Sequence, residues 1–207
     1  MNRRQADSLE LGPEVVRILL PHRRPMLMVD RVLAFGRTPV PWLRAERHIS
    51  ANEDVFDGHF PGLKLWPGIY TIEGLGQTCN LLRVLQGMLD QVEQHGGEPQ
   101  QVLEALRNLE LGFRLQPGFN QDLAERLVRD MPDPSSLLGF STSVEMKFMA
   151  PIFAGQCLRY EVHQTHVIEQ LVRWEVEAEV QGQPVARGVM TARIGVKLPT
   201  VEGLGRW

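Results

Sequence analysis

Two side chains that can move protons lie close together in the sequence. His59 stands in the glycine- and proline-rich stretch DVFDGHFPGLKLWPG, and Glu73 follows it among apolar and small residues. Histidine acts as a base near neutral pH, and a carboxyl group in an apolar site can act as an acid. Together with the free amides of a helix N-terminus, these groups can remove a proton next to a carbonyl and expel a neighbouring hydroxyl.

Each of the two residues also has a plainer interpretation. A histidine beside glycine in a tight turn is often a capping or structural residue. A lone glutamate at the start of a helix can face solvent, where its charge also favours the helix dipole. The combination favours chemistry: His59 in a rigid turn, a Pro67-Gly68 helix entry, and Glu73 one turn inside an apolar helix, where an unpaired carboxylate would be costly.

The stretch behind this loop predicts a long helix. From residue 69 to about 92, apolar residues recur at intervals of three and four. Gln77 and Asn80 fall on the same polar stripe as Glu73, so we expect them to orient its carboxyl group. Gly74 and Gly76 weaken the helix and indicate that another part of the chain approaches closely there.

The remaining elements predict a sheet around this helix. We expect a short helix over 13–20 and strands over 26–35 and 42–50, the latter with Trp42, Arg44, Glu46 and His48 on a wet face. From residue 138 onward a period of two predicts four antiparallel strands, with a hairpin at QGQP. Residues 93–137 read as an insertion of polar, solvated helices. The expected fold is therefore α+β, a single domain over 1–207 with the antiparallel sheet wrapped around the long helix.

Composition narrows the functional classes. The net charge of −3 and the sequence pI of about 6.1 argue against nucleic-acid binding. No apolar run is long enough to span a bilayer and no signal peptide follows the basic start, so we expect a cytoplasmic protein. Cys79 and Cys157 are expected to be buried free thiols. With no metal-ligand constellation or glycine-rich phosphate loop in the sequence, we expect no metal and no organic cofactor.

At this point the sequence resembles a known family, the 3-hydroxyacyl-(acyl carrier protein) dehydratases of bacterial fatty-acid synthesis, which have the hotdog fold. The resemblance covers roughly half of the chain, with its motifs in the family's order. They are LLPHRRPMLMVDRV (19–32), GHFPG (58–62), PG (67–68), EGLGQ (73–77) and, more weakly, KFMAPIFAGQCL (147–158). His59 and Glu73 also keep the spacing of the family's catalytic pair.

The resemblance implies a role for each residue. His59 would take the α-proton of the thioester, Glu73 would protonate the departing β-hydroxyl, and the N–H of Gly68 would hold the thioester oxygen. Phe60 and Gly62 would support the turn. The family builds each site from the histidine of one subunit and the carboxylate of the other, which implies a homodimer acting on acyl carrier protein. Plain core packing competes with a role in the acyl tunnel for three strand residues, Phe140, Met146 and Phe148.

Several departures indicate a divergent member of this family. Leu63-Lys64 replaces the family's Arg-Pro after GHFPG, the small residues after Glu73 survive only as Gly74 and Gly76, and Ala154-Gly155-Gln156 replaces Pro-Gly-Asp. The insertion over 93–137 stands where the family has a short loop. It could serve as a lid, as a docking surface for a partner, or as a spacer without a catalytic role. Because the related dehydratase-isomerases have aspartate where Glu73 stands, we expect dehydration alone.

Two other functions remain open. A hotdog thioesterase could use Glu73 to position water at a thioester carbonyl, although His59 would then be idle. A non-catalytic hotdog subunit could keep the turn as structure and bind a partner through the insertion.

Overall fold

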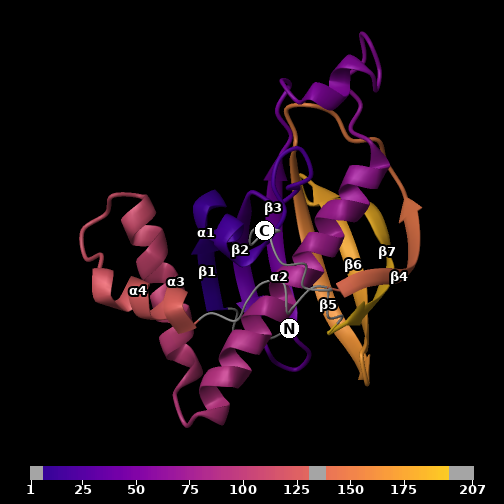
Figure 1. Cartoon of the computed structure of the whole chain (residues 1–207). Helices are drawn as coiled ribbons and strands as arrows, with labels where there is room; N and C mark the ends of the chain where they lie inside the picture. The colour runs from indigo at the N-terminus through magenta and orange to yellow at the C-terminus, as the bar shows by residue number, and fades with distance from the viewer. Residues whose placement is uncertain (1–6, 131–138, 196–207) are drawn as a thin grey trace, which may run out of the picture.

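The structure, a computed structural model, describes residues 7–130 and 139–195, and Figure 1 shows its arrangement. Its helices and strands, in chain order, are β1 (Asp7–Leu11), α1 (Pro13–Leu19), β2 (Arg31–Gly36), β3 (Trp42–His48), the 3-10 helix η1 (Asp54–Asp57), α2 (Gly68–Gln94), α3 (Pro99–Phe113), α4 (Gln121–Asp130), β4 (Gly139–Phe148), β5 (Cys157–Ile168), β6 (Leu171–Val180) and β7 (Gln183–Ile194).

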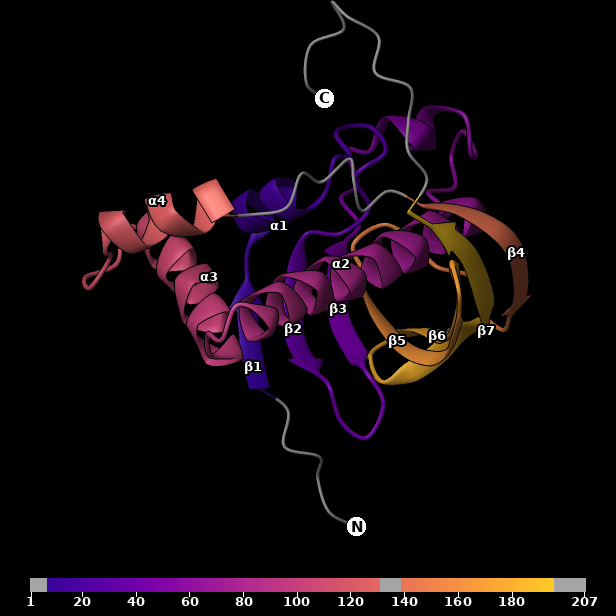
Figure 2. The same cartoon turned by 60° about the horizontal axis from the view of Figure 1, so that its bottom comes forward.

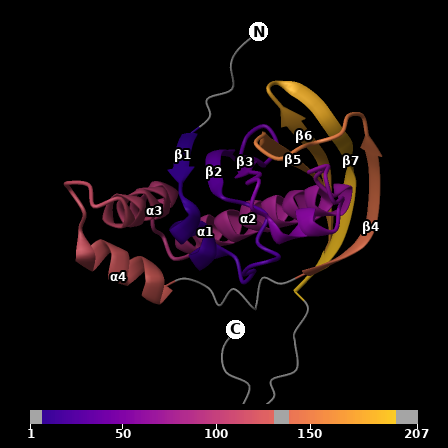
Figure 3. The ribbon, with the colours of Figure 1, turned by 90° about the horizontal axis from the view of Figure 1, so that it is seen from above.

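All seven strands form one antiparallel sheet in the order β1-β2-β3-β5-β6-β7-β4. The sheet curls around α2, with β5, β6, β7 and β4 bending over the N-terminal part of the helix (Figures 2 and 3). This arrangement confirms the predicted α+β fold, in which an antiparallel sheet wraps around a long helix.

α2 fills the concave side of the sheet because apolar residues cover most of its circumference. Twelve of its residues are buried, among them Leu75, Leu82 and Leu85. At Gly74 a Cβ atom would lie 2.2 Å from the hydroxyl oxygen of Tyr160, a fully buried side chain of β5. The close approach that the glycines predicted is therefore real at Gly74, and a side chain rather than a backbone segment makes it.

β1 was not predicted, and β2 begins later than the predicted strand over 26–35. The strand β1 is short, and its identity depends on pairing with β2. The expected wet face of β3 is wrong for two residues, since Trp42 and Glu46 are both buried. The ring of Trp42 stacks on His163 with centroids 6.4 Å apart, and the carboxylate of Glu46 lies 3.4 Å from the guanidinium of Arg31.

The β6–β7 hairpin forms at the predicted place. Gln181 and Gly182 connect the strands with φ angles of 52° and 77°. Two positive φ angles are the signature of a two-residue turn that matches the twist of the flanking strands. The sequence QGQP therefore sets the register of this strand pair.

The helices α3 and α4 occupy the region predicted as an insertion, beyond the C-terminal end of α2 and beside β1 (Figures 2 and 3). The prediction of solvated helices is wrong for α3, because Val102, Leu103, Leu106 and other residues on one face join the hydrophobic core. A carboxylate oxygen of Glu110 also accepts a 2.7 Å hydrogen bond from the backbone N–H of Gly12. The last part of the predicted insertion, 131–137, lies outside the described residues.

Among the described helices, none combines the length and the apolar character that crossing a membrane would require.

Candidate active site

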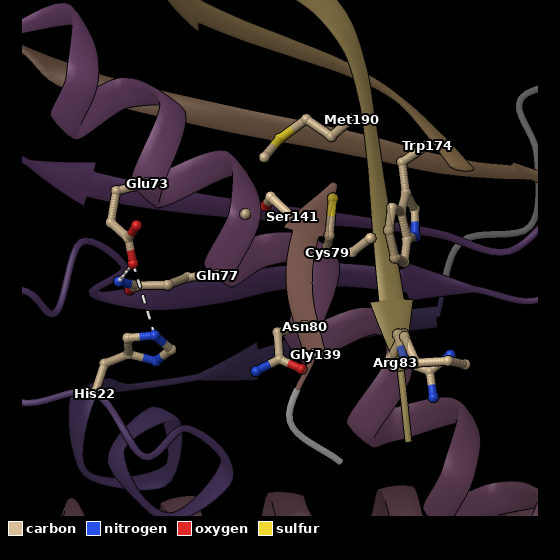
Figure 4. A pocket seen from close by; sticks show the side chains of 13 residues that line it. His22, Glu73, Gln77, Cys79, Asn80, Arg83, Gly139, Ser141, Trp174 and Met190 are labelled. Carbon is tan, nitrogen blue, oxygen red and sulfur yellow. Dashed lines mark hydrogen bonds and ion pairs between the residues drawn. The ribbon is translucent and has the colours of Figure 1, made fainter. Parts of the chain in front are cut away.

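Glu73 lines a cavity of about 260 Å³ between α2 and the strands that curl over it (Figure 4). Glu73 therefore faces this cavity and not open solvent, although 34% of its side chain is exposed. From α2 the cavity is lined by Glu73, Gly76, Gln77, Cys79, Asn80 and Arg83; from other segments it is lined by His22, Gly139, Ser141, Trp174, Met190, Ala192 and Ile194.

Gln77 fixes the carboxyl group of Glu73, as its helical spacing predicted. Its side-chain oxygen accepts a 2.8 Å hydrogen bond from the N–H of Met28. This leaves its amide nitrogen to donate to the carbonyl of Met26 at 2.5 Å and to Oε1 of Glu73 at 2.9 Å. Gln77 is almost fully buried, so one side chain ties the 26–28 segment to the helix and orients Glu73 at once.

His22 is a second neighbour of Glu73, and its position was not predicted from the sequence. Its Nε2 lies 3.6 Å from Oε1 of Glu73. Burial lowers the pKa of His22, against an opposing effect of the Glu73 carboxylate, and nearby Arg23 lowers it further. The imidazole is therefore neutral at neutral pH and forms no ion pair with Glu73. Its place in the PHRRP segment, within the first motif of the family resemblance, was the available signal.

His59 lies in the loop that leads into α2, and its hydrogen bond selects a tautomer. Nδ1 lies 3.0 Å from the carbonyl oxygen of Leu65. Because a carbonyl can only accept, Nδ1 carries the proton and Nε2 keeps a free lone pair in the neutral ring. The ring stacks on Phe60 with centroids 4.3 Å apart, and Gly62 turns the chain with a φ of 84°.

The loop around His59 is anchored to the segment before β5. The N–H of Trp66 donates to Ile152 at 2.8 Å, and the N–H of Ala154 donates to the carbonyl of Lys64 at 3.1 Å. Gln156, which stands where the family has aspartate, accepts a 2.7 Å bond from the N–H of Phe153 and closes the turn. The unusual Ala-Gly-Gln sequence therefore still supports the His59 loop.

Within the described part of a single chain, His59 is not among the residues that line the cavity containing Glu73. Asn80 lines that cavity without a hydrogen bond to Glu73, so its predicted orienting role has no contact behind it. The fold thus places the carboxyl group and Gln77 together, and leaves the imidazole on a separate loop.

Gly68 is the first residue of α2, where the backbone N–H groups have no intrahelical acceptor. Pro67, which precedes it, provides no side-chain cap. A Cβ atom at position 68 would lie 2.9 Å from the ring of Phe148, the last residue of β4. Glycine therefore lets Phe148 pack over the start of the helix while the amides stay available to an oxygen atom of a ligand.

Of the three strand residues proposed for the tunnel or the core, Met146 alone packs against the core in a single chain. Phe140 and Phe148 are 52% and 46% exposed, and Met146 is half-buried. The alternative of plain core packing is therefore wrong for the two phenylalanines.

One cluster on the sheet has the residue types of a metal site. Single ligand atoms of Glu46, His48 and Cys157 lie within 4.8 Å of one another where β3 pairs with β5. Burial, with the neighbouring Glu46 carboxylate, raises the pKa of Cys157 to about 11. The thiol is therefore protonated at neutral pH, and Glu46 already faces Arg31.

The sequence is similar to proteins of one family. A family model described as the FabA-like domain matches residues 20–114. The 3-hydroxyacyl-[acyl-carrier-protein] dehydratase FabZ of Helicobacter hepaticus is 38% identical over 96 residues, which are 44% of this chain and 57% of that protein. FabZ of Helicobacter pylori is 29% identical over 178 residues, 85% of this chain and 86% of the relative.

In several of these matches the chain spans about half of the relative's own length, as with FabZ of Mannheimia succiniciproducens, of which it covers 41% at 50% identity. Among solved structures, the dehydratase heterocomplex ApeI:P from Xenorhabdus doucetiae superimposes with a TM-score of 0.53 at 16% identity, covering 88% of this chain and 91% of the other. That likeness concerns the fold. With its FabA-like segment, its wrapped sheet and its similarity to FabZ sequences, the chain has the hotdog fold and resembles the FabZ dehydratases.

Proposed function

We propose that this chain is a 3-hydroxyacyl-(acyl carrier protein) dehydratase that forms trans-2-enoyl thioesters. The observation that supports this most directly is Glu73 on the wall of a cavity, held by Gln77, one turn inside a helix that begins at Gly68, whose N–H has no acceptor among the described residues. Similarity to FabZ dehydratases supports the same activity.

The proposed reaction is an elimination of water. Nε2 of His59 takes the α-proton, and the electrons of that C–H bond form the new double bond. The β C–O bond breaks as the protonated Glu73 gives its proton to the departing hydroxyl, which leaves as water. The N–H of Gly68 stabilises the negative charge on the thioester oxygen. The cycle closes when the proton on His59 returns to Glu73. No redox change occurs, so acid, base and amide are sufficient.

We infer that the active form is a homodimer joined along β4. This strand ends the sheet order, and all its residues except Met146 are exposed, including Phe140, Val144 and Phe148. An unpaired strand edge with exposed aromatic side chains favours pairing with another strand. In such a dimer His59 of one subunit would face Glu73 of the other, which accounts for their separation within one chain.

Mixed dimers test both the residues and their arrangement. We expect His59→Ala and Glu73→Gln each to abolish formation of the enoyl thioester, followed by its ultraviolet absorbance. When the two variants are co-expressed, half of the dimers are mixed and carry one intact site of two, so about a quarter of the wild-type activity should return.

No recovery in the mixed preparation, with the mixed dimer confirmed by mass spectrometry, would contradict a site shared between subunits. Full activity in either single variant would contradict the catalytic roles. Release of free thiol from acyl thioesters without enoyl formation would identify a thioesterase instead. Because the similar solved structure is called a heterocomplex, native mass spectrometry of the purified chain also decides between a homodimer and a need for a second subunit.

We further infer that the acyl group arrives on acyl carrier protein and that the enzyme works in the cytoplasm. FabZ relatives bear the carrier protein in their names, and the two cysteines of this chain form no disulfide.

A further inference from the structure

Arg83 lines the cavity of Glu73, and no described carboxylate pairs with it. Its Nε is buried without a hydrogen bond, and no ion pair or hydrogen bond of its guanidinium is formed with any described residue. Other arginines of the described chain do pair with carboxylates: Arg37 with Glu93, Arg47 with Asp30, and Arg114 with Glu110. Arg83 is also half-buried, so its unpaired charge is costly to keep.

The charge of Arg83 is unopposed because no carboxylate of the described chain comes near it. Burial lowers the pKa of Arg83, and no neighbouring charge opposes that effect. Glu73 lies at the other end of the cavity (Figure 4), ten residues away along the same helix, or about 15 Å along its axis. The cavity therefore has the carboxyl group of Glu73 at one end and, at the other, the guanidinium of Arg83, which no described carboxylate pairs with.

Further hydrogen-bonding groups line the same cavity. Asn80 and Ser141 are two of them, and the indole N–H of Trp174, another lining residue, is buried without an acceptor among the described residues. Buried indole N–H groups usually find a partner. Cys79, Met190, Ala192 and Ile194 contribute the apolar part of the lining. A purely alkyl chain would fill the apolar part and leave the donors unpaired.

We propose that the substrate of this chain is an acyl thioester whose far end carries a carboxylate that pairs with Arg83. This inference rests on the proposed function, since it takes the cavity beside Glu73 as the acyl site. A guanidinium presents its donors in a planar fork that matches the two oxygens of a carboxylate. The anion offsets the charge of the half-buried Arg83, which neither a methyl nor a hydroxyl end can do.

Three 3-hydroxyacyl-pantetheine thioesters of equal length, ending in carboxylate, hydroxyl or methyl, provide the test. We expect kcat/KM for the carboxylate end to exceed that for the methyl end by at least about tenfold, because the methyl end leaves the guanidinium unpaired. Arg83→Met should remove this preference while keeping turnover of the methyl-ended substrate. Arg83→Lys should keep part of it. Arg126→Met, at an exposed position of α4, is the matched control and should change nothing.

Equal kcat/KM values for carboxylate and methyl ends in the wild-type protein would overturn the proposal. So would an equal loss on both substrates in Arg83→Met, because it would make Arg83 a structural residue. If no thioester is dehydrated at all, the proposed function fails, and calorimetry with non-hydrolysable amide analogues then decides the subsite alone. Tighter binding of the carboxylate-ended amide to the wild-type protein than to Arg83→Met supports the subsite, and equal binding overturns it.

Discussion

Among the described neighbours of Glu73, Gln77 does most to position the site, through three side-chain hydrogen bonds. Its one side-chain amide bonds to the N–H of Met28, the carbonyl of Met26 and the carboxylate of Glu73. Leucine at this position would keep the volume and remove all three hydrogen bonds. The substitution should therefore lower both the free energy of unfolding and kcat, each through the loss of a different hydrogen bond.

We expect Gln77→Leu to lower the free energy of unfolding by about 1–3 kcal/mol, because the buried N–H of Met28 loses its acceptor. We also expect kcat to fall by about ten- to a hundredfold, since the carboxyl group of Glu73 is no longer oriented. Urea unfolding and steady-state kinetics measure the two effects. Asn80→Leu is the control, because Asn80 lines the cavity without bonding Glu73; a kcat loss as large as that of Gln77→Leu would contradict the orienting role.

Part of the site could be predicted at this scale, and part could not. The polar stripe from Glu73 through Gln77 follows from helix spacing alone. Arg83 continues that stripe and is the only charged residue between Glu73 and Asp90, which was the available signal. What spacing cannot reveal is that no described residue pairs with Arg83, because that depends on which residues of other segments surround it.

At the scale of elements, the contact between α2 and β5 decides how closely the helix approaches the sheet. Tyr160 is fully buried, and its side chain occupies the space that a Cβ at Gly74 would need. At Gly76 the corresponding Cβ would meet its nearest atom, of Met190, at 3.4 Å. The two glycines, only two residues apart, therefore differ: Tyr160 leaves no room for a Cβ at Gly74, whereas a Cβ at Gly76 would make an ordinary contact.

Gly74→Ala should destabilise the fold even though alanine is the better helix former. The gain in helix propensity is about 1 kcal/mol, whereas overpacking against a buried side chain costs about 1–3 kcal/mol. In Gly76→Ala the gain is nearly unopposed, so its stability should be unchanged or raised. Thermal unfolding followed by circular dichroism compares the two variants. An equal rise of both melting temperatures would show that Tyr160 moves aside at little cost, and would contradict the expected overpacking.

The long helix and the strands from residue 139 onward were predicted because their periodicities run over many residues. The short strand β1 was missed, since five residues carry little periodic signal and its structure depends on β2. The burial of Glu46 was also missed. A carboxylate in a strand reads as solvent-facing unless its partner, here Arg31, is known.

For the molecule as a whole, activity is expected to depend on assembly. If His59 and Glu73 meet only between subunits, a monomer that is fully folded should be inactive. Val144 lies on the open edge strand, is 38% exposed, and is not among the residues that line the cavity. A charge at this position should disturb the pairing of subunits without unfolding either one.

We expect Val144→Asp to sediment as a monomer at low micromolar concentration and to lose dehydratase activity while keeping its circular dichroism spectrum. Ile168→Asp is the matched control, because Ile168 is 68% exposed at the end of β5, away from that edge. Its sedimentation and activity should match the wild-type protein. An active Val144→Asp monomer would contradict the shared site.

The two borders of the sheet differ, and the difference would limit the number of copies that can associate. Beside β1, α3 packs against the sheet and its Glu110 accepts a hydrogen bond from the N–H of Gly12, whereas no described strand pairs with the outer edge of β4 at the far side. If two copies pair along β4, as proposed, the dimer has no open β4 edge left. Strand addition along β4 would then end with the dimer, so we expect no growth into fibrils by that route.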